Sequence, residues 1–258
     1  MLNRRFINAF TAVVLAGMVT LNFFVPVVWQ LYLLIVLLWL LTTICGSFFI
    51  RWDYHLKSLH AIRNSDRLEV AITFDDGPDP EFTPKVLALL KQHGAKATFF
   101  CIGQQLLKHP HILAEIIADG HSVGNHTYTH TKLFGFLGLS SVLDELQKTN
   151  AIVKATTGLD MKLYRPCFGV TNPKIEKAVQ ILKLRSIGWR VRSLDTTPRG
   201  QSRVLNRITS KLVKGDIVLL HDTSGKTVAV LEQLLLFLRE NNLKSVTVDQ
   251  LLNIEAYA

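Results

Sequence analysis

Charged side chains are absent from a long stretch near the N-terminus of this chain of 258 residues. No Asp, Glu, Lys, Arg or His occurs from Phe6 to Ile50, whereas a helix that crosses a bilayer needs only about 20 apolar residues. Pro26 lies in a short uncharged connection near the middle of this stretch. The sequence therefore predicts a transmembrane hairpin of two hydrophobic helices, 6–24 and 31–50.

The length of the uncharged stretch limits the alternatives. The apolar core of a secretory signal peptide has only about 7–15 residues and ends at a small-residue cleavage site, so it does not account for the whole stretch. Two alternatives remain, namely a fully buried hairpin in a soluble protein and a monotopic hairpin that enters one leaflet without crossing. Arg4 and Arg5 precede the hairpin and Arg51 follows it, which by the positive-inside rule predicts a bacterial inner (cytoplasmic) membrane protein with both ends in the cytoplasm.

Cysteine is scarce, and no motif for nucleic-acid binding is present. Cys45, Cys101 and Cys167 are an odd, scattered set that does not indicate a disulfide framework. The formal net charge is +9, which in a membrane-bound protein favours anionic lipid over nucleic acid as a partner. We expect the membrane, and no nucleic acid, among the partners.

Three regions follow from these patterns: the hairpin at 1–50, a juxtamembrane linker at 51–67 and a catalytic domain at 68–258. In the last region, β-rich segments alternate with amphipathic helical patterns, which indicates an α/β fold. The predicted strands are 68–74, 97–102, 122–124, 162–164, 185–191, 216–220 and 245–248, and the predicted helices are 83–93, 104–118, 140–157, 173–182, 202–213 and 227–240. A glycine-rich phosphate loop is missing after the first strand, so a distorted (β/α) barrel of about seven parallel strands is favoured over a doubly wound sheet.

Two adjacent carboxylates, Asp75 and Asp76, follow the first predicted strand. Neighbouring residues on a strand point to opposite sides, so the two acids act differently unless the backbone bends at the strand end, and Gly77 permits that bend. In a barrel, catalytic groups gather at the carboxyl ends of the strands. By itself the Asp-Asp-Gly-Pro stretch would be interpreted as a solvated surface turn.

Histidines follow the third predicted strand. His126 and His130 are four residues apart, the spacing that places two imidazoles on one face of a helical turn. With a strand-end carboxylate they would make three protein ligands, which leaves an open position at a catalytic zinc-like cation for a water of lowered pKa. The second strand-end acid would then take the water's proton. His121 is interpreted as structural.

Four motifs in order resemble the polysaccharide deacetylase family, which has the NodB homology domain and is similar to carbohydrate esterase family 4. They are Asp75-Asp76-Gly77-Pro78, His126-Thr127-Tyr128-Thr129-His130, Arg165-Pro166-Cys167-Phe168-Gly169 and Leu219-Leu220-His221-Asp222. The resemblance covers residues 68–252 and leaves the hairpin outside.

The resemblance implies a role for each matching residue. It makes Asp75 the general base, and it makes Asp76, His126 and His130 the ligands of a divalent transition metal, usually Zn²⁺. Arg165 is similar to the arginine that keeps the catalytic aspartate ionised and oriented. The backbone N–H of Phe168 matches the oxyanion donor, and His221 resembles the general acid.

This chain departs from the family pattern at three places. Cys167 and Phe168 replace the usual proline and tyrosine, and a cysteine hydrolase is the rival interpretation, although no local signature nominates a base for the thiol. Asp195 lacks the tryptophan that normally accompanies the aspartate of the fourth family motif, and it is expected to support Arg165 or His221. Trp189 is either a shifted substitute for that tryptophan or a core residue.

The expected function is therefore zinc-dependent removal of the N-acetyl group of an amino sugar, with hydrolysis of a linear amide. The hairpin and its predicted orientation favour a polyprenyl-phosphate-linked or other lipid-linked glycan over a polymer outside the cell. The alternatives are a peptidoglycan or exopolysaccharide deacetylase, a deformylase of a lipid-linked amino sugar, and a non-catalytic carbohydrate-binding membrane scaffold.

Overall fold

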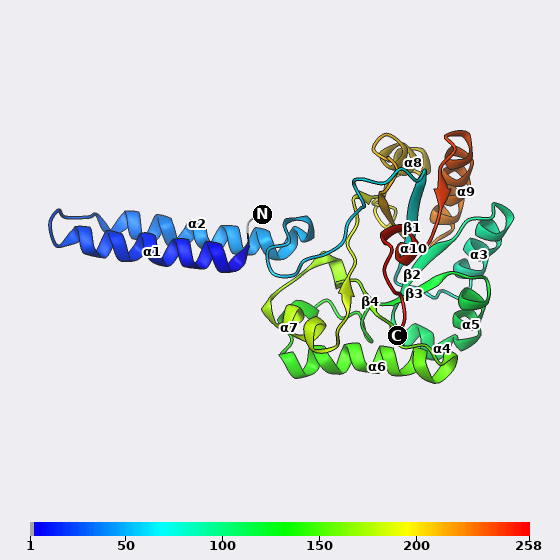
Figure 1. The fold of residues 1–258 in the computed structure, drawn as a ribbon, viewed down its shortest axis with the longest axis horizontal. Coiled ribbons are helices and arrows are strands. Elements are labelled where there is room, and N and C mark those ends of the chain that lie inside the picture. The colour runs from blue at the N-terminus through cyan, green and yellow to red at the C-terminus, as the bar shows by residue number, and fades with distance from the viewer. Residues whose placement is uncertain (1–2) are drawn as a thin grey trace.

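A helical hairpin projects from an α/β domain in the computed structural model, which describes residues 3–258 (Figure 1). Helix α1 spans Arg4–Asn22 and α2 spans Trp29–Phe48, with 19 and 20 residues. At about 1.5 Å per residue each helix is about 30 Å long, the thickness of the hydrocarbon core of a bilayer.

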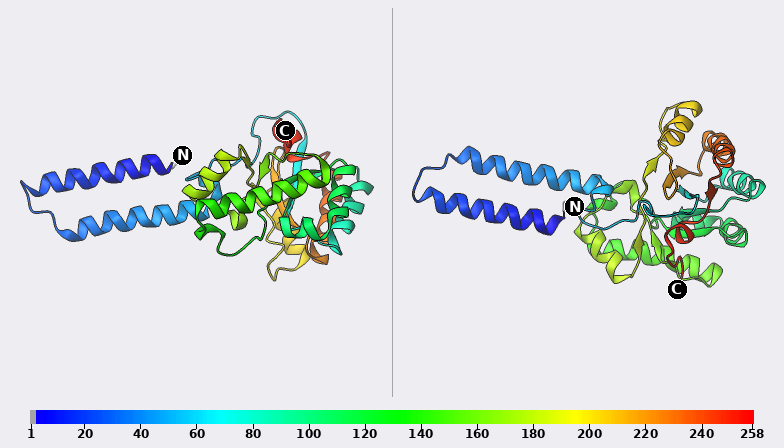
Figure 2. Two further views of the ribbon diagram at one scale, coloured as in Figure 1. Left: turned by 90° about the horizontal axis from the view of Figure 1, so that it is seen from below. Right: turned by 45° about the horizontal axis from the view of Figure 1, so that its top comes forward.

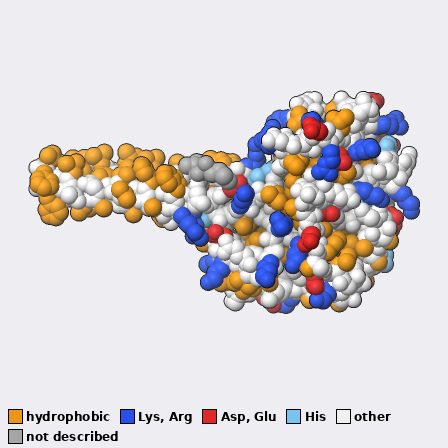
Figure 3. Space-filling model, viewed as in Figure 1, with side chains coloured by type: hydrophobic (Ala, Val, Ile, Leu, Met, Phe, Trp, Pro, Cys, Tyr) orange, Lys and Arg blue, Asp and Glu red, His pale blue; other side chains and the backbone are white. Residues whose placement is uncertain are grey.

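The hairpin exposes almost all of its apolar surface. Within the described residues α1 has no buried residue, and in α2 only Gly46 is buried. Figure 3 shows hydrophobic side chains covering the hairpin, with Lys and Arg side chains on the α/β domain. The interpretation as a buried hairpin of a soluble protein is therefore wrong, because its helices would be covered by protein.

The sheet is parallel throughout and has the strand order β5-β4-β3-β2-β1-β7-β6, with β8 paired to β1. Its strands are β1 (Glu69–Asp75), β2 (Ala97–Cys101), β3 (Ser122–Asn125), β4 (Leu163–Tyr164), β5 (Arg185–Ser186), β6 (Val191–Arg192), β7 (Ile217–His221) and β8 (Lys244–Ser245). Helices surround this curved sheet (Figure 2). The predicted distorted barrel of parallel strands is confirmed.

The helices connect successive strands and cover the outside of the sheet. They are α3 (Phe82–Gln92), α4 (Gly103–Lys108), α5 (Pro110–Ala118), α6 (Leu139–Thr157), α7 (Pro173–Ile181), α8 (Gln201–Thr209), α9 (Gly225–Glu240) and α10 (Val248–Leu252). In β1, Val70, Ile72 and Phe74 join the large outer core, whereas Ala71 belongs to the cluster inside the barrel. The alternation along β1 therefore sends Thr73 and Asp75 to the inner side with Ala71.

Three predicted elements differ from the structure. The predicted strand 185–191 is divided into β5, which pairs with β4, and β6, which pairs with β7. The predicted helix 104–118 is two helices, because Pro110 begins α5 and lacks the N–H that a continuous helix requires. The predicted strand 245–248 stops at Ser245, and α10 follows it behind a Thr247–Gln250 capping box.

Residues 51–67, the predicted linker, lie against the barrel. Leu59 forms a bridge with Ile187, and its N–H donates to the Ser186 carbonyl over 2.9 Å. A side chain on Gly188 would collide with the His60 ring, so this close approach requires glycine. The segment thus supplies backbone partners where the strand between β5 and β6 is interrupted.

Candidate active site

The two adjacent acids, Asp75 and Asp76, diverge at the carboxyl end of β1. Asp75 is the last residue of β1 and is buried, whereas Asp76 has a φ of 75°. The predicted bend is therefore at Asp76 itself. Gly77 is required for another reason, since a side chain there would collide with the carboxylate of Asp222.

His126 and His130 meet Asp76 in the loop that follows β3. Their Nε2 atoms each lie 3.4 Å from Asp76 Oδ1. The expected helical turn is wrong: the segment is a loop in which Thr127 and His130 have φ values of 66° and 51°. Left-handed backbone at non-glycine residues is typical of strained functional sites.

The donor set of Asp76, His126 and His130 fits a divalent metal ion such as zinc. One ligand atom from each residue lies within 4.8 Å of the other two, and tetrahedral ligands at about 2.0–2.1 Å from zinc are about 3.3 Å apart. His126 Nδ1 donates to the Arg165 carbonyl over 2.9 Å, so Nε2 keeps its lone pair for a metal.

Charge at the three ligands also suits a cation. Burial opposes ionisation of Asp76, but the hydrogen bond and charge of His126 bring its pKa down to about 2. Burial and the neighbouring His126 lower the pKa of His130 to about 4, which leaves a neutral imidazole at pH 7. Burial lowers the pKa of His126, yet the Asp75 and Asp76 carboxylates raise it overall, and the same negative charges attract a metal ion.

Arg165, at the end of β4, is fully buried and holds Asp75. Its NH1 group donates to Asp75 Oδ1 and to Thr73 Oγ1, both over 2.7 Å. Nε and NH2 donate to the Ile187 and Gly188 carbonyls. Every guanidinium nitrogen therefore has an acceptor, and one carboxylate oxygen of Asp75 is fixed in position.

The residues that depart from the family pattern lie beside the candidate metal ligands. Phe168 has a φ of 56°, its side chain is half exposed, and its ring is 4.6 Å from that of His130. Burial raises the pKa of the Cys167 thiol, whose contacts are the Thr127 hydroxyl and the His126 carbonyl. A buried thiol with a raised pKa is a poor nucleophile, which argues against the cysteine hydrolase. Trp189 is buried with Ile50 and Leu219 in the core.

His221 faces the site from β7, directly opposite Asp75 in the β1–β7 ladder. Its Nδ1 is 2.8 Å from Asp195 Oδ1, and its N–H donates to Asp195 Oδ2 over 2.8 Å. Asp195 thus orients His221 and not Arg165. Burial lowers the pKa of His221, but the hydrogen bond to Asp195 and the charge of Asp75 raise it overall.

The comparisons with known proteins agree with this geometry. The family model described as polysaccharide deacetylase matches residues 63–187. A Bacillus cereus peptidoglycan-N-acetylglucosamine deacetylase is 34% identical over 201 residues, which cover 74% of this chain and 91% of that protein. This chain belongs to the polysaccharide deacetylase family.

Other members of the family differ in length and activity. A second Bacillus cereus peptidoglycan-N-acetylglucosamine deacetylase is 36% identical, and the match covers 62% of this chain but only 58% of that protein. A crystal structure of a peptidoglycan N-acetylglucosamine deacetylase with a bound hydroxybenzamide (4-naphthalen-1-yl-N-oxidanyl-benzamide) has a TM-score of 0.72 at 30% identity and covers 78% of this chain and 95% of that one. A carbohydrate esterase family 4 pseudoenzyme from Bacillus anthracis has a TM-score of 0.70 at 28% identity, and the match covers 76% of this chain and 69% of that one. The fold alone therefore does not establish catalysis.

Several supporting residues of this deacetylase-family site were missed by sequence reasoning. Glu145 on α6 accepts the backbone N–H groups of Tyr128 and Thr129 and so fixes the histidine loop. Ser193 and Thr227 donate to the Asp195 carboxylate. Glu145 and Thr227 act on partners that are distant in sequence, and Ser193 acts on Asp195 two residues away. No local sequence pattern marks these contacts.

His221 is not bonded to Asp222, the residue that follows it. The Asp222 carboxylate points away from it and accepts a hydrogen bond from the Thr83 hydroxyl. Burial raises the pKa of Asp222 to about 7. Consecutive strand residues face opposite sides, so Asp222 supports the loop at Gly77 while His221 faces the site.

The Asp195→Asn variant is expected to shift the alkaline limb of the pH profile of kcat to lower pH. A general acid must be protonated, so activity falls as pH rises through the pKa of His221, and loss of the Asp195 charge lowers that pKa. The measurement is kcat from pH 5 to 10 with Thr197→Ala as the control. An unchanged alkaline limb would contradict the pairing.

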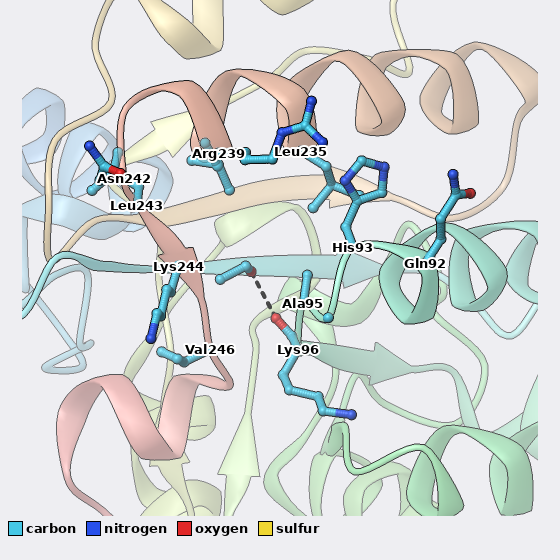
Figure 4. A pocket seen from close by; sticks show the side chains of 13 residues that line it. Gln92, His93, Ala95, Lys96, Leu235, Arg239, Asn242, Leu243, Lys244 and Val246 are labelled. Atoms are coloured by element: carbon cyan, nitrogen blue, oxygen red, sulfur yellow. Dashed lines mark hydrogen bonds between the residues drawn. The ribbon is translucent and has the colours of Figure 1, made fainter.

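A separate hollow of about 760 Å³ lies between α3, α9 and β8 (Figure 4). His93, Lys96, Arg239 and Lys244 are among its lining residues, and the Ser245 hydroxyl donates to the Lys96 carbonyl over 2.7 Å. It adjoins the start of β2, opposite the carboxyl ends where the acids and histidines meet, and no Asp or Glu is among its lining residues in the described chain, 3–258. It is not a second candidate active site.

Proposed function

We propose that this protein is a metal-dependent N-deacetylase of an amino sugar, with Zn²⁺ as the metal. The observation that carries the proposal is the convergence of Asp76, His126 and His130 with Asp75 and His221 at one end of the barrel. One group of residues fits a metal, and the other offers an acid and a base for amide hydrolysis.

Two different residues carry out the two proton transfers of the proposed reaction. Asp75, held by Arg165, accepts the proton of the attacking water. The backbone N–H of Phe168 donates to the oxygen that becomes negative in the transition state. His221, held by Asp195, donates a proton to the departing nitrogen, which is needed because amines leave poorly as anions. A bound metal ion supplies Lewis-acid polarisation of the amide carbonyl and lowers the pKa of a water.

We further propose that the hairpin is anchored in the inner membrane with the deacetylase domain in the cytoplasm. Both ends of the hairpin reach this domain, where Arg4 pairs with Glu176 over 2.9 Å. Arginines and lysines lie on this side, and the connection between α1 and α2 is uncharged. A reporter fused after Ala258 tests the orientation. An extracytoplasmic reporter would favour a cell-wall or exopolysaccharide polymer instead.

A lipid-linked amino sugar is the substrate that suits this placement. A cytoplasmic active site beside the bilayer reaches glycans on a lipid or polyprenyl phosphate before export, whereas the finished polymer lies outside. The formal net charge of +9 favours attraction to an anionic lipid phosphate. The relatives named as peptidoglycan-N-acetylglucosamine deacetylases support an amino sugar as the substrate. They do not support its attachment to a lipid carrier.

Metal content and acetate release test the enzyme against the non-catalytic scaffold. In the full-length protein, His130→Ala is expected to lose bound zinc and to lower acetate release at least about 10²-fold, because removal of one of three ligands leaves an incomplete metal site. His111→Ala, an exposed histidine on α5, is the matched control with full zinc and activity. A His130→Ala protein with wild-type zinc and turnover would contradict the proposal.

A further inference from the structure

An apolar groove of about 480 Å³ lies between the C-terminal end of α2 and the loop around residues 132–136. Its walls include Ile44, Phe48, Phe136, Phe168 and Val170. One wall thus belongs to the proposed membrane helix and the other to the barrel, so the groove begins where the hydrocarbon core of the bilayer would end.

The position of α2 on the barrel is fixed by polar and packing contacts. Thr171 N donates to the Ser47 carbonyl over 2.9 Å, and the Ser47 hydroxyl lies 3.0 Å from His55 Nε2. Gly46 packs so closely on Tyr54 that a side chain there would collide with the ring. These contacts hold the two walls of the groove in fixed positions relative to each other.

Large apolar side chains are exposed around the groove. Phe136 is 83% exposed and Phe48 is 62% exposed. Phe48 belongs to α2 and Phe136 to the facing wall of the groove, so exposed apolar surface lies on both walls. Contiguous exposed apolar surface is costly in water and marks a binding or membrane surface.

The inner end of the groove lies beside the candidate metal site. Phe168 lines the groove, and its ring contacts the imidazole of His130 with centroids 4.6 Å apart. Lys132, two residues beyond His130, is the one charged residue among the described residues that line the groove. An occupant would therefore have an apolar body, an anionic group at Lys132 and a reacting group near His130.

We propose that this groove binds the hydrocarbon chain of a lipid-linked amino-sugar substrate, with its phosphate at Lys132 and its N-acyl group at the metal site. The inference rests on the proposed deacetylase function. Continuity with the exposed surface of α2 lets the chain enter from the bilayer. The apolar walls, Lys132 and the candidate metal site follow one another along the groove. The hydrocarbon chain, the phosphate and the amino sugar follow one another in the same order in the substrate.

The test compares two substrates with full-length protein in detergent micelles. Both carry N-acetylglucosamine phosphate, one on a long polyprenyl chain and one on a short prenyl chain. The wild type is expected to have the higher kcat/KM on the long chain. Phe136→Asp is expected to lower the ratio of long-chain to short-chain kcat/KM about tenfold, as a charge replaces apolar surface at the chain.

The matched control is Leu107→Asp, which places the same charge at an exposed leucine on α4 outside the groove and is expected to keep both rates. If the wild type deacetylates neither substrate, the proposed function fails. If it deacetylates both and the ratio is the same in Phe136→Asp, the groove proposal is overturned and the function stands. Phospholipid copurifying in the groove together with equal rates on both chains would assign the groove to bulk lipid and also overturn the proposal.

Discussion

Replacement of Asp75 by Asn is expected to lower kcat by about 10²–10⁴-fold, the range typical for loss of a general base. Asn keeps the shape of the side chain and accepts the hydrogen bond from Arg165, but it does not take a proton from water. Asp75 Oδ2 lies 3.8 Å from His126 Nε2, whereas Asp76 Oδ1 lies 3.4 Å from the same atom. Zinc content, measured by mass spectrometry of the purified protein, is therefore expected to stay at the wild-type value.

Asp76→Asn is the matched comparison for Asp75→Asn. The two residues are adjacent in sequence, yet only Asp76 is one of the three candidate ligands. Asp76→Asn is expected to lose both zinc and activity, whereas Asp75→Asn loses activity alone. Equal zinc loss in both variants would contradict the division of roles between the two acids.

Replacement of Arg165 by Met is expected to lower the free energy of unfolding by about 3–5 kcal/mol, because removal of one partner leaves a buried charge uncompensated. Arg165 is fully buried, and its bond to Asp75 is 2.7 Å long. The guanidinium also lies 4.0 Å from the centre of the Phe100 ring, a packing contact that methionine only partly replaces. Denaturant unfolding of the full-length protein in detergent measures the change.

The control and the double variant separate charge from packing. Arg192→Met removes an exposed arginine on β6, and we expect a change within about 0.5 kcal/mol. The Asp75→Asn/Arg165→Met double variant is expected to be less destabilised than the sum of the single variants, since neither charge remains. Additive losses would show that the ion pair does not carry the effect.

The positions of the acids and histidines could be predicted because they depend on local sequence. Asp75 and Asp76 follow an alternating strand, and parallel strands bring their carboxyl ends to one edge. His126 and His221 also lie at or just beyond strand ends. Their roles came from family resemblance, since the spacing of His126 and His130 suggested a helical turn that does not exist.

The parts that were not predicted depend on contacts between distant segments. Leu59, in a segment expected to be a linker, pairs with Ile187 where the strand between β5 and β6 is interrupted. Glu145 fixes the histidine loop from the middle of α6. Asp76 has a left-handed φ of 75°, which few non-glycine residues adopt and which the alternation along the strand does not predict. The hydrophobic periodicity of a sequence predicts which face of a helix or strand is buried, but it does not predict which segment packs against that face.

The groove beside α2 was also beyond the reach of the sequence. Phe136 and Phe168 are isolated aromatic residues in loops, and only the docking of α2 places them around one groove. The hydropathy of residues 6–50 indicated a membrane anchor but not that its end forms part of a pocket. In the proposed account, the anchor therefore contributes to substrate binding as well as to location.

Mass spectrometry of lipid extracts shows whether the protein deacetylates a lipid-linked amino sugar in cells. Cells that lack the wild-type protein are supplied with either the wild type or Asp75→Asn, expressed at equal levels. The expected result is that a lipid-linked glycan retaining its N-acyl amino sugar accumulates with Asp75→Asn and that the free amine form appears with the wild type. Identical lipid-linked glycans in both extracts, with the acyl content of a cell-wall or secreted polymer changed instead, would contradict it.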